Sequence, residues 1–143
     1  MPEQKKVKAI FDTHVWISFL IGKRLQSVNE LIASKEIQIV VAENIFEELK
    51  DVTSRPKIKK YFSKEKVEDL IELLRIVGLS YKIKPKHLFK LDPKDSYLLD
   101  LIDKSNANYL VTGDKELLAL AKFKTAKIIR PNDFEKEITT LFK

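Results

Sequence analysis

The amino-acid sequence predicts an α/β fold with a short, mostly parallel sheet. The prediction depends on a pattern found near both ends of the chain: an apolar run of strand length, an aspartate after it, and then helical periodicity. The first copy is Val7–Phe11 with Asp12, and the second is Tyr109–Val111 with Asp114 after a two-residue turn. Continuous apolar runs of this kind are typical of parallel strands that are buried on both faces.

The first half of the chain contains four helical patterns and one more strand. A helix over 15–20 is too apolar for the surface, and a second pattern over 45–52 has an apolar stripe that ends before Pro56. Another helix begins after Ser63 and ends at Gly78. The remaining predicted segments are a helix over 28–34, a buried strand over 37–41 and a basic connector over 55–60.

The second half begins with a half-buried or edge strand over 79–83, where apolar residues alternate with polar ones. A basic, proline-containing connector over 82–90 follows. The next helix has Asp92 as its predicted N-cap, Pro93 in its first position and Asp95 in its third. The last predicted segments are a strand over 127–129 and a helix from Asn132 that turns Phe134, Ile138 and Leu141 inward.

Length, composition and charge limit the classes of protein that this chain can be. Its 143 residues predict a single domain over 1–143, and the absence of cysteine excludes disulfides, Cys-based zinc sites and thiol nucleophiles. Without a membrane-length apolar run or a signal peptide, we expect a cytoplasmic protein with no membrane partner. The net charge of +6 suits a polyanion such as nucleic acid or an acidic protein segment, although a lysine-rich surface can also be merely solvated.

Two helical acids share a face with apolar residues. Glu48 projects within about 20 to 60° of the apolar stripe of its helix, whereas Glu47 points to the opposite side. Asp95 shares a face with the leucines of its helix, while Asp100 and Asp103 point away. A carboxylate at the edge of an apolar face is costly unless something pairs with it, so Glu48 and Asp95 are candidates for ligand binding.

Four acids thus lie at a strand end or on the inner face of a nearby helix: Asp12, Glu48, Asp95 and Asp114. Taken alone, Asp114 is equally explained as a helix cap, and a capping-box acid is the simpler account of Asp95. A buried group of unpaired carboxylates would repel itself unless cations lie among its members. Oxygen ligation suits Mg²⁺ or Mn²⁺, which bridge phosphate oxygens and activate water. With the basic surface, this chemistry predicts hydrolysis of phosphodiesters.

Four motifs follow one another along the chain: FDTHVWIS at 11–18, EELKDVTSRPKI at 47–58, LDPKDSYLL at 91–99 and NYLVTGDKELL at 108–118. Together they resemble the PIN-domain proteins of the VapC type, the nuclease toxins of prokaryotic toxin–antitoxin pairs. The resemblance runs nearly from end to end. Each motif is weak alone, but four in this order with suitable spacing are specific.

The resemblance implies a three-layer α/β/α sandwich, PIN-like and Rossmann-like, and RNA cleavage that depends on Mg²⁺ or Mn²⁺. It assigns the catalytic and metal-binding roles to Asp12, Glu48, Asp95 and Asp114. It also implies a homodimer that is neutralised by an antitoxin protein. Many relatives have Asn where His14 stands, and we interpret His14 as a packing or hydrogen-bonding residue near the site rather than a ligand.

Residues around the four acids have supporting roles in this interpretation. The hydroxyls of Thr13 and Thr112 would orient Asp12 and Asp114, respectively, through hydrogen bonds. Glu116 could reach a second metal ion, although an exposed first-turn acid is the simpler account. The candidate RNA-binding residues are Arg55, Lys57, Lys59, Lys60, Lys82, Lys84 and Lys86.

The sequence therefore predicts a metal-dependent endoribonuclease, acting as the toxin of a toxin–antitoxin pair. One alternative is a PIN nuclease of RNA processing. Another is a PIN-fold RNA- or protein-binding module without turnover, which the complete acid set argues against. An aspartyl-phosphate phosphatase or receiver-like domain would need an acid pair after the first strand, where the sequence has only Asp12.

Overall fold

A computed structural model of the chain describes residues 7–21, 30, 36–61, 63–89 and 93–141. Within these residues one sheet has the strand order β3-β2-β1-β4-β6-β5, and only β5 is antiparallel to its neighbour. The strands are β1 (Val7–Phe11), β2 (Ile37–Val41), β3 (Leu79–Ser80), β4 (Tyr109–Val111), β5 (Lys122–Phe123) and β6 (Ala126–Ile129). The helices are α1 (Thr13–Ile21), α3 (Glu43–Ser54), α4 (Pro56–Lys59), α5 (Lys64–Val77), the 3₁₀ turn η1 (Pro93–Asp95), α6 (Ser96–Ser105), α7 (Lys115–Leu120) and α8 (Pro131–Leu141).

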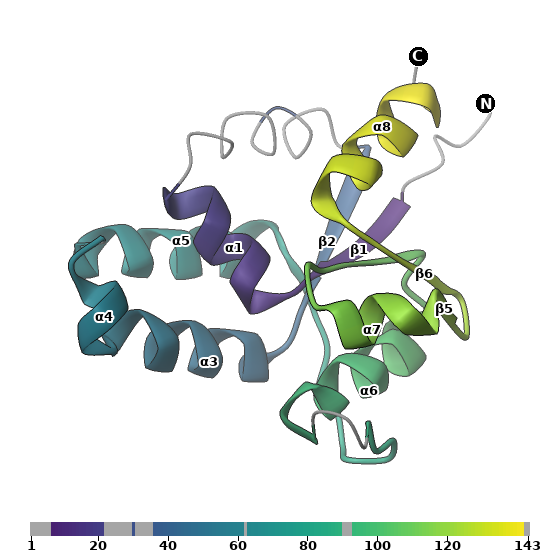
Figure 1. The fold of residues 1–143 in the computed structure, drawn as a ribbon, viewed down its shortest axis with the longest axis horizontal. Coiled ribbons are helices and arrows are strands. Elements are labelled where there is room, and N and C mark those ends of the chain that lie inside the picture. Colours follow the sequence, from purple (N-terminus) through teal and green to yellow (C-terminus); the bar gives the residue numbers. More distant parts are fainter. Residues whose placement is uncertain (1–6, 22–29, 31–35, 62, 90–92, 142–143) are drawn as a thin grey trace.

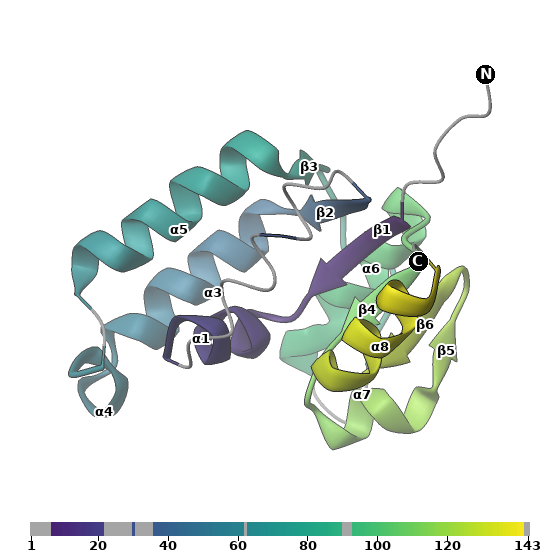
Figure 2. The ribbon, with the colours of Figure 1, turned by 90° about the horizontal axis from the view of Figure 1, so that it is seen from above.

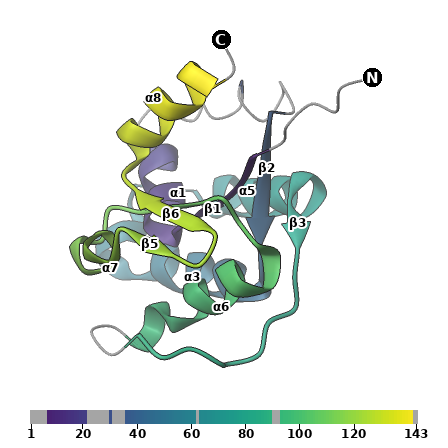
Figure 3. The ribbon, with the colours of Figure 1, turned by 90° about the vertical axis from the view of Figure 1, so that its right-hand side faces the viewer.

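Helices cover both faces of the sheet. Figure 1 shows α8 above the strands and α6 below them, and Figure 3 shows the same two helices on opposite sides. Helices α3 and α5 lie side by side, as Figure 2 shows from above. This arrangement confirms the predicted three-layer α/β/α fold on a mostly parallel sheet.

The strand order reverses at β1, which pairs with β2 on one side and with β4 on the other. The chain runs outward from β1 to β2 and β3, and it then returns to the far side of β1 to form β4. Phe11 pairs with Val111 at the carboxyl ends of β1 and β4. The residues that follow, Asp12 and Thr112, therefore leave the sheet side by side, at the position where open parallel sheets bind ligands.

An aromatic cluster anchors β1 to the helices of one face. The Phe11 ring makes edge-to-face contacts with Trp16, Phe19 and Phe134, at centroid distances of 4.9, 6.1 and 5.4 Å. Phe11, Trp16 and Phe134 are at most 2% exposed. Because Phe11 immediately precedes Asp12, the packing of this cluster also fixes the backbone at the end of β1.

Most predicted elements are confirmed. β1, β2 and β4 occupy the predicted ranges, and Ser63 caps α5 by accepting a hydrogen bond from the Lys66 N–H at 3.2 Å. The predicted helix over 28–34 and the predicted N-cap Asp92 lie outside the described residues. Across the part of the chain that the structure describes, none of the helices combines the length and the apolar character needed to span a membrane.

Several local predictions are wrong. The connector over 55–60 contains the one-turn helix α4, because Pro56 occupies a first helical position. The strand predicted over 79–83 is limited to two residues in β3, and β5 was not predicted. Leu141 is 59% exposed instead of buried, because the last turn of α8 extends past β6 (Figure 3).

The segment 81–89 crosses α6 and is held there by two aspartates. Asp100 is 6% exposed and accepts hydrogen bonds from the backbone N–H groups of Lys86 and His87 at 3.1 and 2.7 Å. Asp103 contacts Lys86 Nζ at 3.3 Å, His87 Nε2 at 2.9 Å and Lys124 Nζ at 3.8 Å. Both acids therefore fasten a connector to the helix.

Asp103→Asn is expected to destabilise the protein modestly at neutral pH and to have no effect in acid. The hydrogen bond from His87 and the nearby lysines hold the pKa of Asp103 below its ordinary value of 3.8. Such a carboxylate stabilises the fold above its ordinary pKa, and the contribution disappears as the pH falls through the lowered pKa. Urea unfolding of both proteins from neutral pH to about pH 2 measures this difference. A deficit that is the same at every pH would contradict the prediction.

Gly78, which ends α5, is required by close packing rather than by backbone conformation. Its φ of −79° is ordinary for any residue. A Cβ atom at Gly78 would clash with the Leu74 carbonyl oxygen and would lie 2.9 Å from Val41 Cγ2 on β2. The glycine therefore allows the end of α5 to approach the sheet.

Gly78→Ala is expected to lower the free energy of unfolding by about 1–3 kcal/mol, because the carbonyl oxygen that it meets cannot rotate away. Gly113→Ala is the matched control, since nothing lies within 4 Å of a Cβ atom at Gly113. It should be neutral, or stabilising by about 0.4–1 kcal/mol through the unfolded chain. Urea unfolding of the wild type and both variants measures these differences. Equal unfolding midpoints would contradict the prediction, because they would show that α5 shifts to accept the added Cβ atom without loss of stability.

Candidate metal centre

Asp12 is the most rigidly held acid of the site. Its backbone N–H donates to the Val111 carbonyl at 3.0 Å, and its carbonyl accepts from the N–H groups of Val15 and Trp16 at the start of α1. The side chain is also fixed: Oδ2 accepts from the Thr112 hydroxyl at 2.8 Å, and Oδ1 accepts from the His14 N–H at 3.3 Å. At 3% exposure, this carboxylate lies inside the junction of β1 and β4.

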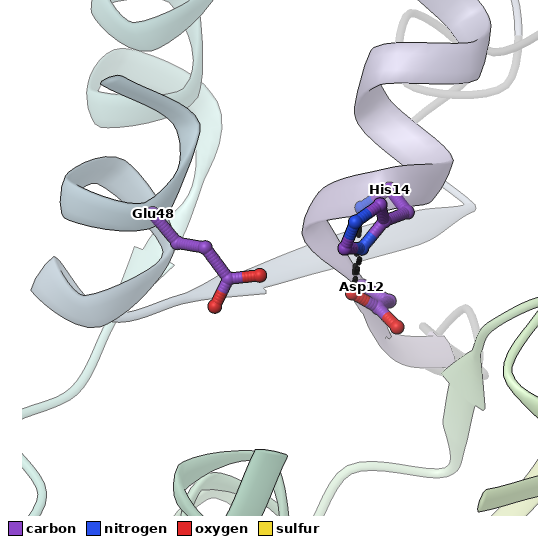
Figure 4. A group of neighbouring side chains, drawn as sticks. All are labelled: Asp12, His14 and Glu48. Carbon is purple, nitrogen blue, oxygen red and sulfur yellow. Dashed lines mark hydrogen bonds and ion pairs between the residues drawn. The ribbon is translucent and has the colours of Figure 1, made fainter. Parts of the chain in front are cut away.

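Glu48 reaches the same junction from α3 (Figure 4). It is half-buried whereas Glu47 is exposed, as the helical projection predicted. The Tyr97 hydroxyl donates to Glu48 Oε2 at 3.3 Å and lies 3.5 Å from the Thr13 hydroxyl oxygen. The Glu48 carboxylate of α3 is therefore surrounded by hydroxyl groups from α1 and α6.

His14 is the third member of the group that converges here. Its Nδ1 lies 3.7 Å from Asp12 Oδ1, and its side chain is 70% exposed. One ligand atom each from Asp12, His14 and Glu48 can be chosen so that all three lie within 4.8 Å of one another (Figure 4). The exposure of His14 rules out the predicted packing role, and its hydrogen bond to Asp12 comes from the backbone N–H rather than from the ring.

The charges of the site act on one another. Burial, followed by the negative charge of Asp12, raises the pKa of Glu48 above its ordinary value. The Asp12 carboxylate raises the pKa of His14, and the charges of Glu48 and Asp95 add to this effect. Burial, followed by the Glu48 charge, raises the pKa of Tyr97, so its hydroxyl stays protonated and can donate. The site is therefore rich in negative charge that nearby protein groups only partly balance.

Asp95 and Asp114 occupy different surroundings. Asp95 is 8% exposed. It is the N-cap residue of α6 rather than the third residue of the helix, as was predicted, and its side chain makes no capping hydrogen bond. The η1 turn accounts for the difference. Asp114 does cap a helix, because it accepts from the N–H groups of Glu116 and Leu117 at the start of α7. The capping alternative thus describes Asp114 and not Asp95.

A groove of about 520 Å³ connects half-buried Glu48 and buried Asp95 with solvent. Its walls include Glu48, Asp95, His14 and Tyr97, and its rim includes two cationic residues, Arg55 and Lys94. Glu48 and Asp95 therefore face the same space from α3 and from the start of α6. Among the described residues, Asp114 is linked to this group through Thr112, whose hydroxyl accepts from the Asp114 N–H at 3.1 Å while it donates to Asp12.

The predicted partners of the two threonines were wrong. Thr112 orients Asp12 from the neighbouring strand, and it binds Asp114 through the backbone rather than the carboxylate. Thr13 is fully buried, and its hydroxyl faces Tyr97 and Glu48 instead of Asp12. The reason is that Thr13 begins α1, so its side chain points toward α3 and α6.

A family model described as PIN domain matches residues 8–116, from β1 to the start of α7. The chain belongs to the PIN-domain family. Neither the curated proteins nor the solved structures contain a match to the chain. The matched range holds all the acids discussed above, while β6, which pairs with β4 in the same sheet, lies beyond it.

The donors of this PIN domain fit the divalent metals that its fold family uses. Asp12 and Glu48 present carboxylate oxygens to each other, and their repulsion contributes to the raised pKa of Glu48. A bound cation would relieve that repulsion. The residues that would hold a Mg²⁺ or Mn²⁺ ion are Asp12, Glu48 and Asp95, with His14 beside them and Asp114 at the edge.

The predicted RNA-binding cations divide into three places. Arg55 is on the rim of the groove, where it also pairs with Asp51 at 2.9 Å. Lys57, Lys59 and Lys60 are exposed in or beside α4. The lysines at 82, 84 and 86 line a separate pocket with Asp100 and Asp103. Arg55 is therefore the predicted cation that shares the groove with the acids.

Sequence reasoning did not select Tyr97 or Lys94, although both lie in the LDPKDSYLL motif. The groups that Tyr97 contacts come from α1 and α3, and the periodicity of one helix carries no information about contacts between helices. For Lys94, a signal was available, because a cation directly precedes Asp95 in the sequence.

Tyr97→Phe is expected to weaken Mn²⁺ binding by about tenfold, because the loss of groups that orient ligands typically has an effect of that size or larger. The ring remains, so the fold should keep nearly all of its stability, less about 1 kcal/mol for the lost hydrogen bond. Isothermal titration calorimetry measures the metal affinity. The control is Tyr81→Phe, because the Tyr81 hydroxyl accepts a hydrogen bond from Lys8 Nζ at 3.3 Å and, among the described residues, does not contact the acids of the site. Equal affinities of the two variants would contradict an orienting role for Tyr97.

Proposed function

We propose that this PIN domain is a divalent-metal-dependent endoribonuclease that hydrolyses RNA phosphodiester bonds. The observation that carries the proposal is the approach of Asp12 and Glu48 to one another at the strand-order reversal, in a domain of the PIN family. Asp95 faces the same solvent-accessible groove as Glu48. Such a placement costs stability through charge repulsion and desolvation, so a function that uses the charge explains it better than folding does.

The chain's residues would divide the work between binding and positioning. A bound Mg²⁺ or Mn²⁺ ion would supply activation of water and would offset the charge that develops on the leaving oxygen. Thr112 and the His14 N–H hold Asp12 in place, and Tyr97 holds Glu48. Arg55 and Lys94 on the rim would contact the phosphates of the RNA backbone, which predicts salt-sensitive binding.

The test is cleavage of a mixed pool of single-stranded and structured RNA by the purified protein with Mn²⁺, with Mg²⁺ and with EDTA. Glu48→Gln should abolish metal-dependent cutting, because it removes the charge and keeps the shape. Glu72→Gln, an exposed acid on α5, is the matched control and should cut like wild type. If Glu48→Gln cuts as fast as wild type, the proposed site is wrong.

A binding module without turnover would give a different pattern. It would retain RNA in a filter-binding assay under every metal condition, and neither wild type nor Asp95→Asn would cut. That result, obtained with protein shown to be folded by circular dichroism, would replace the nuclease with the binding module.

For the cellular role we propose the toxin of a toxin–antitoxin pair, a cytoplasmic homodimer that an antitoxin protein neutralises. The support is the resemblance of the four sequence motifs to VapC-type proteins. Induced expression of the wild type should stop growth of a bacterial host, and expression of Glu48→Gln should not. Active enzyme that leaves growth unchanged would favour a role in RNA processing instead.

A further inference from the structure

His14 differs from the other members of the group in chemistry and in exposure. It is the only nitrogen donor among the three grouped residues, and its side chain is 70% exposed while that of Asp12 is 5% exposed. Its backbone is fixed in the first turn of α1, two residues after Asp12. Figure 4 shows the imidazole beside the Asp12 carboxylate, at the start of α1.

The contact between His14 and Asp12 leaves the imidazole available to a third partner. The separation of 3.7 Å between Nδ1 and Asp12 Oδ1 is longer than an ordinary N–H···O hydrogen bond. Asp12 Oδ1 already accepts from the His14 backbone N–H, and Oδ2 accepts from Thr112. A hydrogen bond from the ring is therefore not needed to hold Asp12 in place.

The spacing of the three side chains suits a common ion. Two ligands of one divalent ion, each bound at about 2.0–2.2 Å, are at most about 4.4 Å apart. The ligand atoms of Asp12, His14 and Glu48 lie within 4.8 Å of one another. Small rotations of these side chains, of which that of His14 is the most exposed, would bring all three within reach of one ion.

We infer that His14 supplies a nitrogen ligand to the metal of this site and makes the site prefer Mn²⁺ to Mg²⁺. The inference rests on the metal site of the proposed function and adds to it the ligand set and the choice of metal. Mg²⁺ takes oxygen ligands and keeps its water, whereas transition-metal ions bind imidazole more readily. Carboxylates together with one imidazole therefore favour the transition-metal ion, while an all-carboxylate site would not make this distinction.

The sequence contains two histidines, and the second provides the control. His87 lies on the connector across α6, where its Nε2 contacts Asp103 at 2.9 Å and its ring packs against Phe123. It shares neither the groove nor the acids of the site, as far as the described residues show. His14→Ala and His87→Ala thus remove the same side chain from two unrelated places.

The experiment is pulsed electron paramagnetic resonance of the full chain loaded with Mn²⁺, together with competition by Mg²⁺. In wild type and in His87→Ala, the electron spin echo should carry the ¹⁴N modulation of a coordinated imidazole. In His14→Ala the modulation should be absent, and the ratio of Mg²⁺ to Mn²⁺ dissociation constants should fall by about tenfold. Circular dichroism checks that each variant is folded.

Two results would overturn the inference in different ways. Bound Mn²⁺ without ¹⁴N modulation, and with the same metal preference in His14→Ala as in wild type, would leave the metal site intact and limit His14 to its contact with Asp12. Failure of the folded wild type to bind Mn²⁺ or Mg²⁺ would remove the metal site itself, and with it the proposed nuclease mechanism.

Discussion

Asp12→Asn is expected to lower the rate of RNA cleavage by at least about 10³-fold. Asp12 faces Glu48, is held from two directions and lies deepest in the site, at 3% exposure. Asparagine has the same shape, and its oxygen can still accept from the Thr112 hydroxyl, while the longer hydrogen bond from the His14 N–H is lost. The substitution therefore removes the charge and one weak hydrogen bond.

The same variant should be as stable as wild type without metal, or slightly more stable. The negative charge of Asp12 contributes to the raised pKa of Glu48, so the two carboxylates repel each other in the folded protein. Neutralising one of them relieves that cost. Added Mn²⁺ should raise the midpoint of thermal unfolding of the wild type, because a ligand that binds only the folded state stabilises that state. It should leave the unfolding midpoint of Asp12→Asn unchanged.

Single-turnover cleavage and thermal unfolding with and without Mn²⁺ measure the two effects. Asp69→Asn, an exposed acid on α5, controls for the loss of one negative charge. Cleavage by Asp12→Asn within tenfold of wild type would exclude Asp12 from the chemistry. A marked loss of stability without metal would show instead that Asp12 serves the fold.

The central strands could be predicted because their signal is local. β1, β2 and β4 are predominantly apolar runs, interrupted only by Lys8 and Gln38, and burial on both faces favours that composition. β3 and β5 are two residues long, which is too short for any periodicity, and the pairing partners β2 and β6 determine them. The one-turn helix α4 is also too short to show a periodicity, and its basic residues resemble those of a connector.

The site could be predicted where a single element determines the direction of a side chain. Glu48 follows from the apolar stripe of α3, and Asp12 follows from the end of β1. Partners from other elements could not be found in this way: Thr112 reaches Asp12 across the sheet, and Tyr97 reaches Glu48 between helices. The sequence thus indicates which carboxylates point inward, and the tertiary structure determines what holds them.

Phe11→Ala is expected to lower the free energy of unfolding by about 3–5 kcal/mol, the largest loss of stability among the variants considered. Phe11 is 2% exposed, and its ring contacts Trp16 and Phe19 of α1 and Phe134 of α8. Removing the ring takes away its hydrophobic burial and three edge-to-face contacts. It also leaves a cavity that the neighbouring side chains can fill only in part. Urea unfolding should show a lower midpoint with an unchanged slope.

Phe123→Ala separates this effect from the loss of any aromatic ring. Phe123 is half-buried on the edge strand β5, so its removal opens no enclosed cavity and should cost clearly less. Phe11→Leu should recover much of the loss, because the stability depends on filling the space between β1, α1 and α8. If Phe11→Ala loses no more than Phe123→Ala, the cluster does not anchor β1, and the rigid placement of Asp12 must come from its backbone hydrogen bonds alone.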